Sequence, residues 1–127
     1  FPAPRLRAYH PATVVAEKLN ATVILGALNS RMKDFYDMHA ILTHTGIDDE
    51  LLRTAIRGTF ERRNVALPEQ LPVAFTPEFL ENGIKETQWR AFLRRSRLLE
   101  SFDLDLATVL ADLKKRLWPL LSAADHR

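Results

Sequence analysis

The chain has 127 residues, about the size of one domain. Hydrophobic residues make up 46% and charged residues 27%, a globular balance that excludes disorder. The absence of cysteine excludes disulfides, thiolate metal sites and a cysteine nucleophile, and a net charge of +2 is too small to indicate nucleic-acid binding by itself. No stretch approaches the roughly 20 apolar residues of a membrane span, so we expect a cytoplasmic protein with no membrane partner.

Residues 1–10 contain two prolines and no hydrophobic period, which predicts an extended arm. The chain begins with Phe1 instead of Met, and we interpret it as a piece of a longer protein. The remainder, residues 11–127, shows helical periods and no convincing strand alternation. We therefore expect an all-α fold, a compact bundle of about five long helices.

Capping residues and breakers place these helices along the chain. We expect a first helix from Pro11 that meets a breaker at Gly26, a second capped by Ser30, a third capped by Asp48, and two more at about 85–99 and 105–121.

Prolines mark the irregular segments. We expect residues 64–76 to form a loop that crosses the bundle, with a short extended piece at Val73–Phe75. A brief helical turn is expected at Pro77–Glu81. Pro119 is expected to kink or fray the end of the last helix.

Lys18 has an unusual setting for a charged residue. The first helix is apolar around nearly its whole circumference, through Val14, Val15, Leu19, Val23, Ile24, Leu25 and Leu28. Such a helix should be buried, and a buried ammonium group costs several kcal/mol unless an anion meets it. Lys18 therefore either reaches the surface, pairs with an internal carboxylate, or receives a phosphate from outside the chain.

A second group of charges opens the second helix. Asp34 and Asp37 lie three residues apart on one face, directly after Arg31 and Lys33, at a helix N-terminus that favours anions. An ordinary capped helix start explains the same pattern. Because the two helices are consecutive and antiparallel, Lys18 and Asp34 are expected to meet across them.

Four segments of the sequence, taken together, resemble one known protein family. Residues 9–19 and 29–37, followed by Thr59-Phe60-Glu61-Arg62-Arg63 and by residues 88–93, resemble the C-terminal half of the AbiEii/AbiGii nucleotidyltransferase toxin family. The resemblance implies a polymerase-β-like enzyme of abortive infection and type IV toxin–antitoxin systems. Residues 1–10 would then be an arm from a missing N-terminal sheet domain, and residues 11–127 the helical C-terminal domain.

The resemblance also implies roles for the two charged groups. The family's lysine motif falls on Lys18 and its acidic motif on Asp34 and Asp37, which are the expected catalytic residues. Lys18, Arg31 and Lys33 are the expected nucleotide-binding residues, and RNA such as tRNA is an expected acceptor.

The chain departs from the family pattern in its metal-binding half. A Gly-Ser loop is absent, and the Asp103-Leu104-Asp105 sequence lies after the lysine motif, where it is expected to cap the last helix. The four histidines have no metal-ligand spacing, so no metal site is expected in this chain. Mg²⁺ and a nucleoside triphosphate are expected only in the full-length protein, with the N-terminal nucleotidyltransferase domain as partner. The chain alone should be inactive.

A basic stripe gives the alternative interpretation. Arg90, Arg94 and Arg97 lie at i, i+4 and i+7 of the expected fourth helix, and Arg62-Arg63 adds another basic pair. Such arginines are either a solvated helix face or contacts to an RNA backbone. On this alternative, the chain is a non-catalytic helical module that binds RNA or a protein partner.

Overall fold

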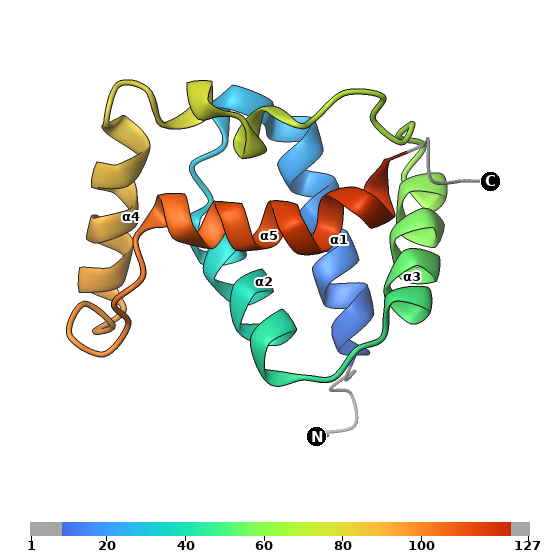
Figure 1. The fold of residues 1–127 in the computed structure, drawn as a ribbon, viewed down its shortest axis with the longest axis horizontal. Helices are drawn as coiled ribbons and strands as arrows, with labels where there is room; N and C mark the ends of the chain where they lie inside the picture. The colour runs from blue at the N-terminus through green and yellow to red at the C-terminus, as the bar shows by residue number, and fades with distance from the viewer. Residues whose placement is uncertain (1–8, 123–127) are drawn as a thin grey trace, which may run out of the picture.

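The computed structural model describes residues 9–122, and these form an all-α fold, as predicted (Figure 1). Its five α-helices are α1 (Pro11–Leu25), α2 (Met32–His44), α3 (Asp49–Arg62), α4 (Ile84–Arg95) and α5 (Leu106–Leu121). Three 3₁₀ turns connect them: η2 (Gly26–Leu28), η3 (Val73–Phe75) and η4 (Pro77–Leu80). The α-helices have 12 to 16 residues, so they are of ordinary length and not long. No described helix is long and apolar enough to cross a bilayer.

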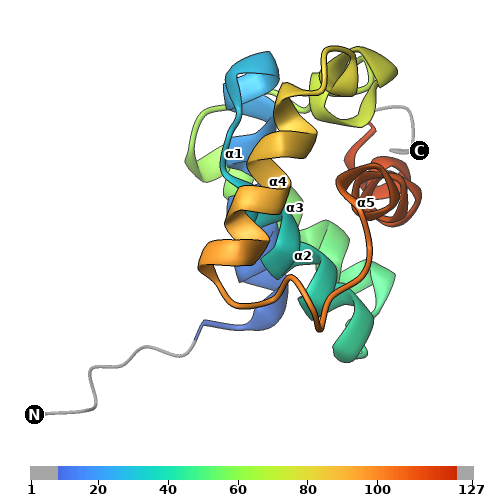
Figure 2. The same ribbon diagram turned by 90° about the vertical axis from the view of Figure 1, so that its left-hand side faces the viewer.

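The helices enclose one core. Helix α1 packs along α3, α5 crosses over α1 and α2, and α4 lies at the end of the molecule opposite α3 (Figure 1). A quarter turn shows α5 end-on, on one side of the other helices (Figure 2). The inward stripe predicted for α5 is fully buried: Leu106, Val109, Leu110, Leu113 and Leu117. Its partners in the core include Leu19, Phe35, Met38, Ile56 and Trp89.

Side-chain caps fix three helix starts. Asp48 accepts a hydrogen bond from the Leu51 amide at 2.8 Å, and Asp105 accepts one from the Thr108 amide at 2.9 Å, so both predicted caps are confirmed. The bonds from Thr108 hold the pKa of Asp105 below its ordinary value. At α1, the ring of His10 accepts from the Ala12 amide. Residues 1–8 of the expected arm lie outside the described part of the chain.

One prediction about the proline-rich segments is wrong. Residues Val73–Phe75 form the 3₁₀ turn η3 instead of an extended piece, because the Phe75 amide bonds to the Pro72 carbonyl at 2.9 Å and Phe75 is buried. Helix α5 does not fray at Pro119 but continues to Leu121, its predicted end, where the side chain is fully buried. In both places tertiary packing decides the local structure.

Helix α4 ends earlier than predicted. It stops at Arg95, and the Leu98 amide then bonds back to the Leu93 carbonyl at 2.7 Å, a closing pattern typical of helix ends. Arg97 takes a left-handed conformation with φ of 60°. The arginine stripe predicted at i, i+4 and i+7 therefore loses its third member, because Arg97 has left the helix.

Candidate functional site

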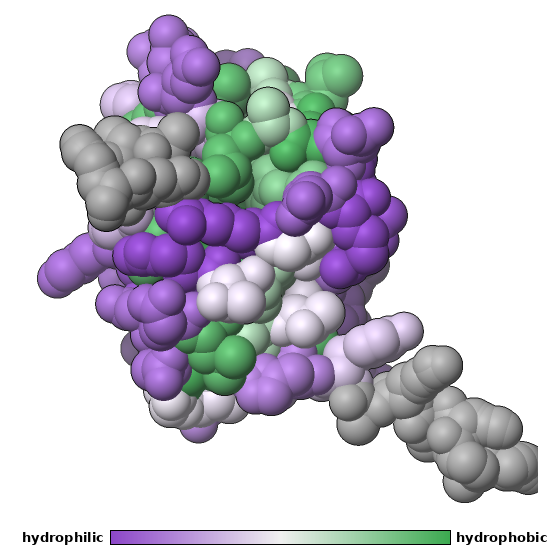
Figure 3. All heavy atoms as spheres, turned by 90° about the vertical axis from the view of Figure 1, so that its right-hand side faces the viewer, coloured by the Kyte–Doolittle hydropathy of each residue, from purple (hydrophilic) through white to green (hydrophobic). Residues whose placement is uncertain are grey.

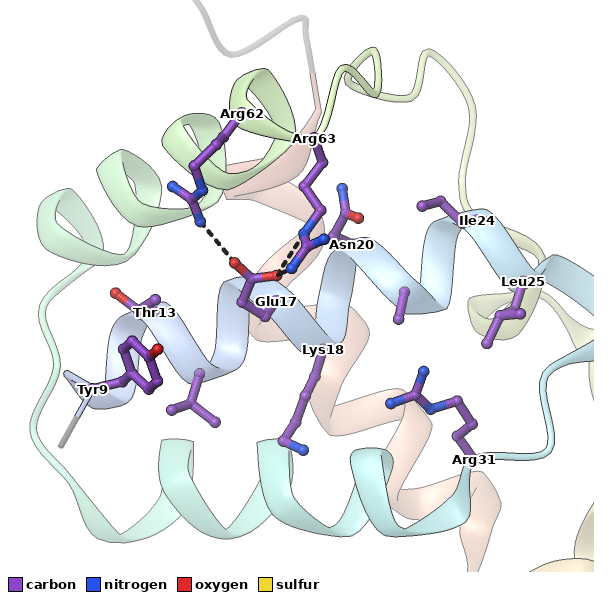
Figure 4. Close-up of a pocket in the computed structure, with 12 residues that line it drawn as sticks. Tyr9, Thr13, Glu17, Lys18, Asn20, Ile24, Leu25, Arg31, Arg62 and Arg63 are labelled. Carbon is purple, nitrogen blue, oxygen red and sulfur yellow. Dashed lines mark hydrogen bonds and ion pairs between the residues drawn. The ribbon is translucent and has the colours of Figure 1, made fainter. Parts of the chain in front are cut away.

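One side of α1 borders an open groove of about 970 Å³ (Figure 4). The first helix was expected to be buried all round, and this is wrong: Ile24 is 59% exposed and Val14 is half-buried on the groove side. In the described chain no other helix covers this face. The groove is lined by α1, the residue before α2 and the end of α3, including Thr13, Val14, Glu17, Lys18, Asn20, Ile24, Arg31, Arg62 and Arg63.

Lys18 lies between the groove and α2. Its Nζ is 3.1 Å from Oδ1 of Asp34 and 3.3 Å from Oδ2 of Asp37, so the predicted meeting of Lys18 and Asp34 is present. The Asp34 side chain is only 8% exposed and that of Lys18 is 22% exposed. Lys18 is thus neither free in solvent nor unpaired in the core, but is held at the groove wall by two internal carboxylates.

Asp34 also binds a second cation. Its Oδ2 lies 2.9 Å from Nε of Arg31 in an ion pair, so each oxygen of this carboxylate has a basic partner. Lys33 lies further out, 73% exposed, with its Nζ 2.7 Å from Asp37, and this hydrogen bond raises the pKa of Lys33. We call Lys18, Arg31, Lys33, Asp34 and Asp37 the Lys18 cluster.

The start of α2 is fixed differently from the prediction. Helix α2 begins at Met32, and the side chain that caps the turn before it is Asn29, not Ser30: its Oδ1 accepts from the Arg31 amide at 2.8 Å. Asn29 is buried, and its carbonyl accepts from Nζ of Lys85 at 2.7 Å. Burial lowers the pKa of Lys85. These bonds place Asp34 in the first turn of α2, as predicted, where the helix dipole favours its charge.

Glu17 forms a second cluster, at the wall of the groove where α1 faces α3. Its Oε2 is 2.7 Å from Arg62 and its Oε1 is 2.8 Å from Arg63. We call these three residues the Glu17 cluster. Sequence reasoning missed it, because Arg62 and Arg63 follow Glu17 by 45 and 46 residues and were assigned to solvent or RNA. Figure 4 shows both guanidinium groups reaching from the end of α3 to Glu17.

Other predicted residues lie elsewhere. Arg90, Arg94 and Arg97 are exposed, and since α4 lies opposite α3, they do not reach the groove (Figure 1). The largely buried His39 has its Nε2 2.8 Å from Oδ2 of Asp112, a pairing that the sequence analysis did not foresee. Within residues 9–122, no three His, Cys, Asp or Glu side chains gather as a metal site would require.

The comparison with known families matches this chain over most of its length. A family model described as "Nucleotidyl transferase AbiEii toxin, Type IV TA system" matches residues 1–113. The matched range includes both the Lys18 cluster and the Glu17 cluster. No curated protein and no solved structure matches the chain.

Proposed function

Because the chain belongs to the AbiEii nucleotidyl transferase toxin family, we propose that it is the helical part of a nucleotidyltransferase toxin whose Lys18 cluster binds the phosphates of a nucleoside triphosphate. The observation that carries this proposal is the ammonium group of Lys18, held by Asp34 and Asp37 at the wall of an open groove. Phosphoryl transfer depends mainly on positioning and charge neutralisation, and a cation fixed in this way supplies both.

The cluster keeps donors free for a ligand. An ammonium group has three N–H donors and a guanidinium group has five. Lys18 directs its donors to two carboxylates, and Arg31 uses its Nε for Asp34, so at least one donor of Lys18 and four of Arg31 remain. Three cations against two carboxylates leave one unit of positive charge. Asp34 acts as a positioning residue, since both its oxygens hold cations.

The described residues do not fit a metal site, because both oxygens of Asp34 and Oδ2 of Asp37 already pair with cations, and no group of three or more His, Cys, Asp or Glu side chains gathers among residues 9–122. We therefore assign the Mg²⁺ ligands to an N-terminal nucleotidyltransferase domain of the same protein. The chain by itself would not transfer nucleotides. In the whole toxin we expect RNA such as tRNA as the acceptor, met in the cytoplasm.

A second candidate function rests on α4. Arg90 and Arg94 are exposed, and neither makes an ion pair within the described chain. Unpaired arginines on one helix face suit the phosphate backbone of RNA or an acidic protein surface. On this alternative, the chain is a non-catalytic binding module and the Lys18 cluster only stabilises the helix pair.

The test replaces Lys18 by Ala in the full-length protein and measures growth inhibition in the host. Loss of the phosphate contact should abolish toxicity, while circular dichroism and the thermal midpoint show that the fold is kept. Lys114→Ala, which removes an exposed lysine of α5, is the matched control and should remain toxic.

The same assay addresses the alternative. If Arg90→Ala and Arg94→Ala abolish toxicity while Lys18→Ala retains it, then the basic face of α4 carries the function and the nucleotide proposal is wrong. Loss of toxicity in the Lys18 variant alone supports the nucleotide proposal.

A further inference from the structure

We propose that Arg62 and Arg63 form a second phosphate-binding wall, so that a nucleotide in the groove contacts α3 as well as the Lys18 cluster. The proposal rests on the function proposed above and adds two ligand-binding residues to it. Its ligand is the polyphosphate chain of a nucleotide.

The first argument is that the two clusters share one groove. Glu17 and Lys18 are consecutive in α1, but Glu17 extends toward α3 and Lys18 toward α2 (Figure 4). Lys18 and Arg31 line the groove together with Arg62 and Arg63. Its volume of about 970 Å³ lies at the upper end of the range, roughly 300–1,000 Å³, that small-molecule pockets occupy. A groove of this size suits a small ligand such as a single nucleotide.

The second argument concerns the arginines themselves. Their side chains are 59% and 57% exposed, so a ligand in the groove can reach them. Glu17 holds Arg62 through one oxygen and Arg63 through the other, which fixes both guanidinium groups in place. Two cations against one carboxylate leave one unit of positive charge and several free N–H donors. Arginines fixed in advance lose less side-chain entropy when they bind phosphate.

The third argument is an unpaired donor on the same side of the groove. Asn20 is 2% exposed, and its Nδ2 has no hydrogen-bond partner among the described residues. Figure 4 shows its side chain extending from α1 beside Arg63. A buried amide without a partner is costly. Asn20 also lines the groove, so a nucleotide bound there is one source of the acceptor that this donor lacks.

The experiment titrates the 127-residue chain with sodium tripolyphosphate and follows the side-chain Nε–Hε signals of its arginines by NMR. This method detects weak binding, which we expect because the metal-holding domain is absent. The signals of Arg62 and Arg63 should move along the titration, whereas those of Arg94 and Arg95 on α4 should not. Uniform movement of all the arginine signals, or none, would overturn the proposal.

Variants make the result quantitative. Arg62→Gln combined with Arg63→Gln should weaken tripolyphosphate binding about tenfold, since two charge-assisted contacts are lost. The matched control Arg94→Gln with Arg95→Gln removes the same charge from exposed positions of α4 and should change affinity less than twofold. Equal losses of tripolyphosphate affinity in the two double variants would show a non-specific charge effect, and the proposed binding role of Arg62 and Arg63 would be wrong. Should the first double variant fail to fold, the signals of the unmodified chain still decide.

Two further experiments distinguish a failure of this proposal from a failure of the function proposed for the Lys18 cluster. If Lys18→Gln leaves the affinity unchanged while the Arg62 and Arg63 variant lowers it, the wall stands and the function proposed for the Lys18 cluster fails. The opposite result keeps that function and rejects the wall. A single-stranded RNA oligonucleotide without a 5′ triphosphate is the last probe: if it moves the Arg62 and Arg63 signals and tripolyphosphate does not, these arginines serve an acceptor, and the proposal is wrong.

Discussion

The Lys18 cluster and the Glu17 cluster begin at consecutive residues of α1, yet they have opposite designs. In the first, an almost buried carboxylate, Asp34, lies between Lys18 and Arg31. In the second, the carboxylate of Glu17 is 31% exposed and lies between two arginines that are more than half exposed. One cluster is therefore built into the packing of two helices, and the other bridges two helices at the surface.

The two clusters therefore depend on the fold in different ways. Charges removed from water must keep their partners, because an unpaired charge there is costly. Surface ion pairs contribute little to the free energy of folding and are screened by salt. Breaking the Lys18 cluster should thus lower the stability of the fold measurably, whereas the Glu17 cluster should respond to salt and to ligands. Three experiments test this contrast, one of them as a reference outside both clusters.

The largest effect is expected for Asp34→Ala. Lys18 and Arg31 would lose the carboxylate they share, and the free energy of unfolding should fall by about 2 kcal/mol, less than for a fully buried pair because both cations touch solvent. Urea denaturation with an unchanged m-value measures this. Asp37→Ala is the matched control and should cost less, since Asp37 is 22% exposed. A larger loss for Asp37 would contradict the contrast.

An intermediate effect is expected for Asp105→Ala. Asp105 belongs to neither cluster, so this substitution is a reference for the size of the stability changes. Loss of the α5 cap should cost about 1 kcal/mol. The pKa of Asp105 is lowered on folding, so its charge stabilises the folded chain fully above the ordinary pKa of 3.8, and this contribution is lost as the pH falls through the lower folded pKa. Denaturation curves between pH 2 and 6, roughly the window in which a carboxylate titrates, measure both effects.

Asp105→Asn is the control for that pH dependence. It keeps an oxygen that can accept from the Thr108 amide but cannot titrate, so the cap should remain while the acid-dependent part disappears. The same pH profile in both proteins would show that another carboxylate is responsible.

The smallest effect is expected in the Glu17 cluster. A double-mutant cycle of Glu17→Gln and Arg62→Gln should give a coupling of about 0.5 kcal/mol, because Arg62 is largely exposed. In roughly 0.5 M sodium chloride this coupling should nearly vanish, since the Debye length is then only a few ångströms. The corresponding cycle of Lys18 and Asp34 should keep most of its coupling. Equal salt sensitivity of the two cycles would remove the distinction drawn here.

The Lys18 cluster could be anticipated from the sequence because its information is local. Two consecutive helices with a short connection usually run antiparallel, which brings an ammonium group on the first close to carboxylates in the first turn of the second. The caps at Asp48 and Asp105 were predictable for the same reason, since a cap needs only the residues of its own turn.

The Glu17 cluster was not predictable because it depends on how α3 packs on α1. Nothing in the residues around Arg62 says that the end of its helix returns to a position 45 residues earlier. The choice of Asn29 over Ser30 has a similar origin, since the buried Asn29 is bonded by Lys85 from α4, which is far along the chain. The apolar circumference of α1 was misread as burial, whereas part of it lines the groove.

The bond from Lys85 to the carbonyl of Asn29 has a consequence for how this chain can change in evolution. It joins the first turn of α4 to the connection between α1 and α2, which positions Arg31 and Asp34. The length of the segment between α3 and α4 therefore matters, because it determines where Lys85 lies. Extra residues in its exposed stretch around 69–70 can bulge outward without moving Lys85. An insertion just before α4 would move Lys85 away from the carbonyl of Asn29 and displace the start of α2. The inserted residues would affect the Lys18 cluster although they lie far from Lys18 in the sequence.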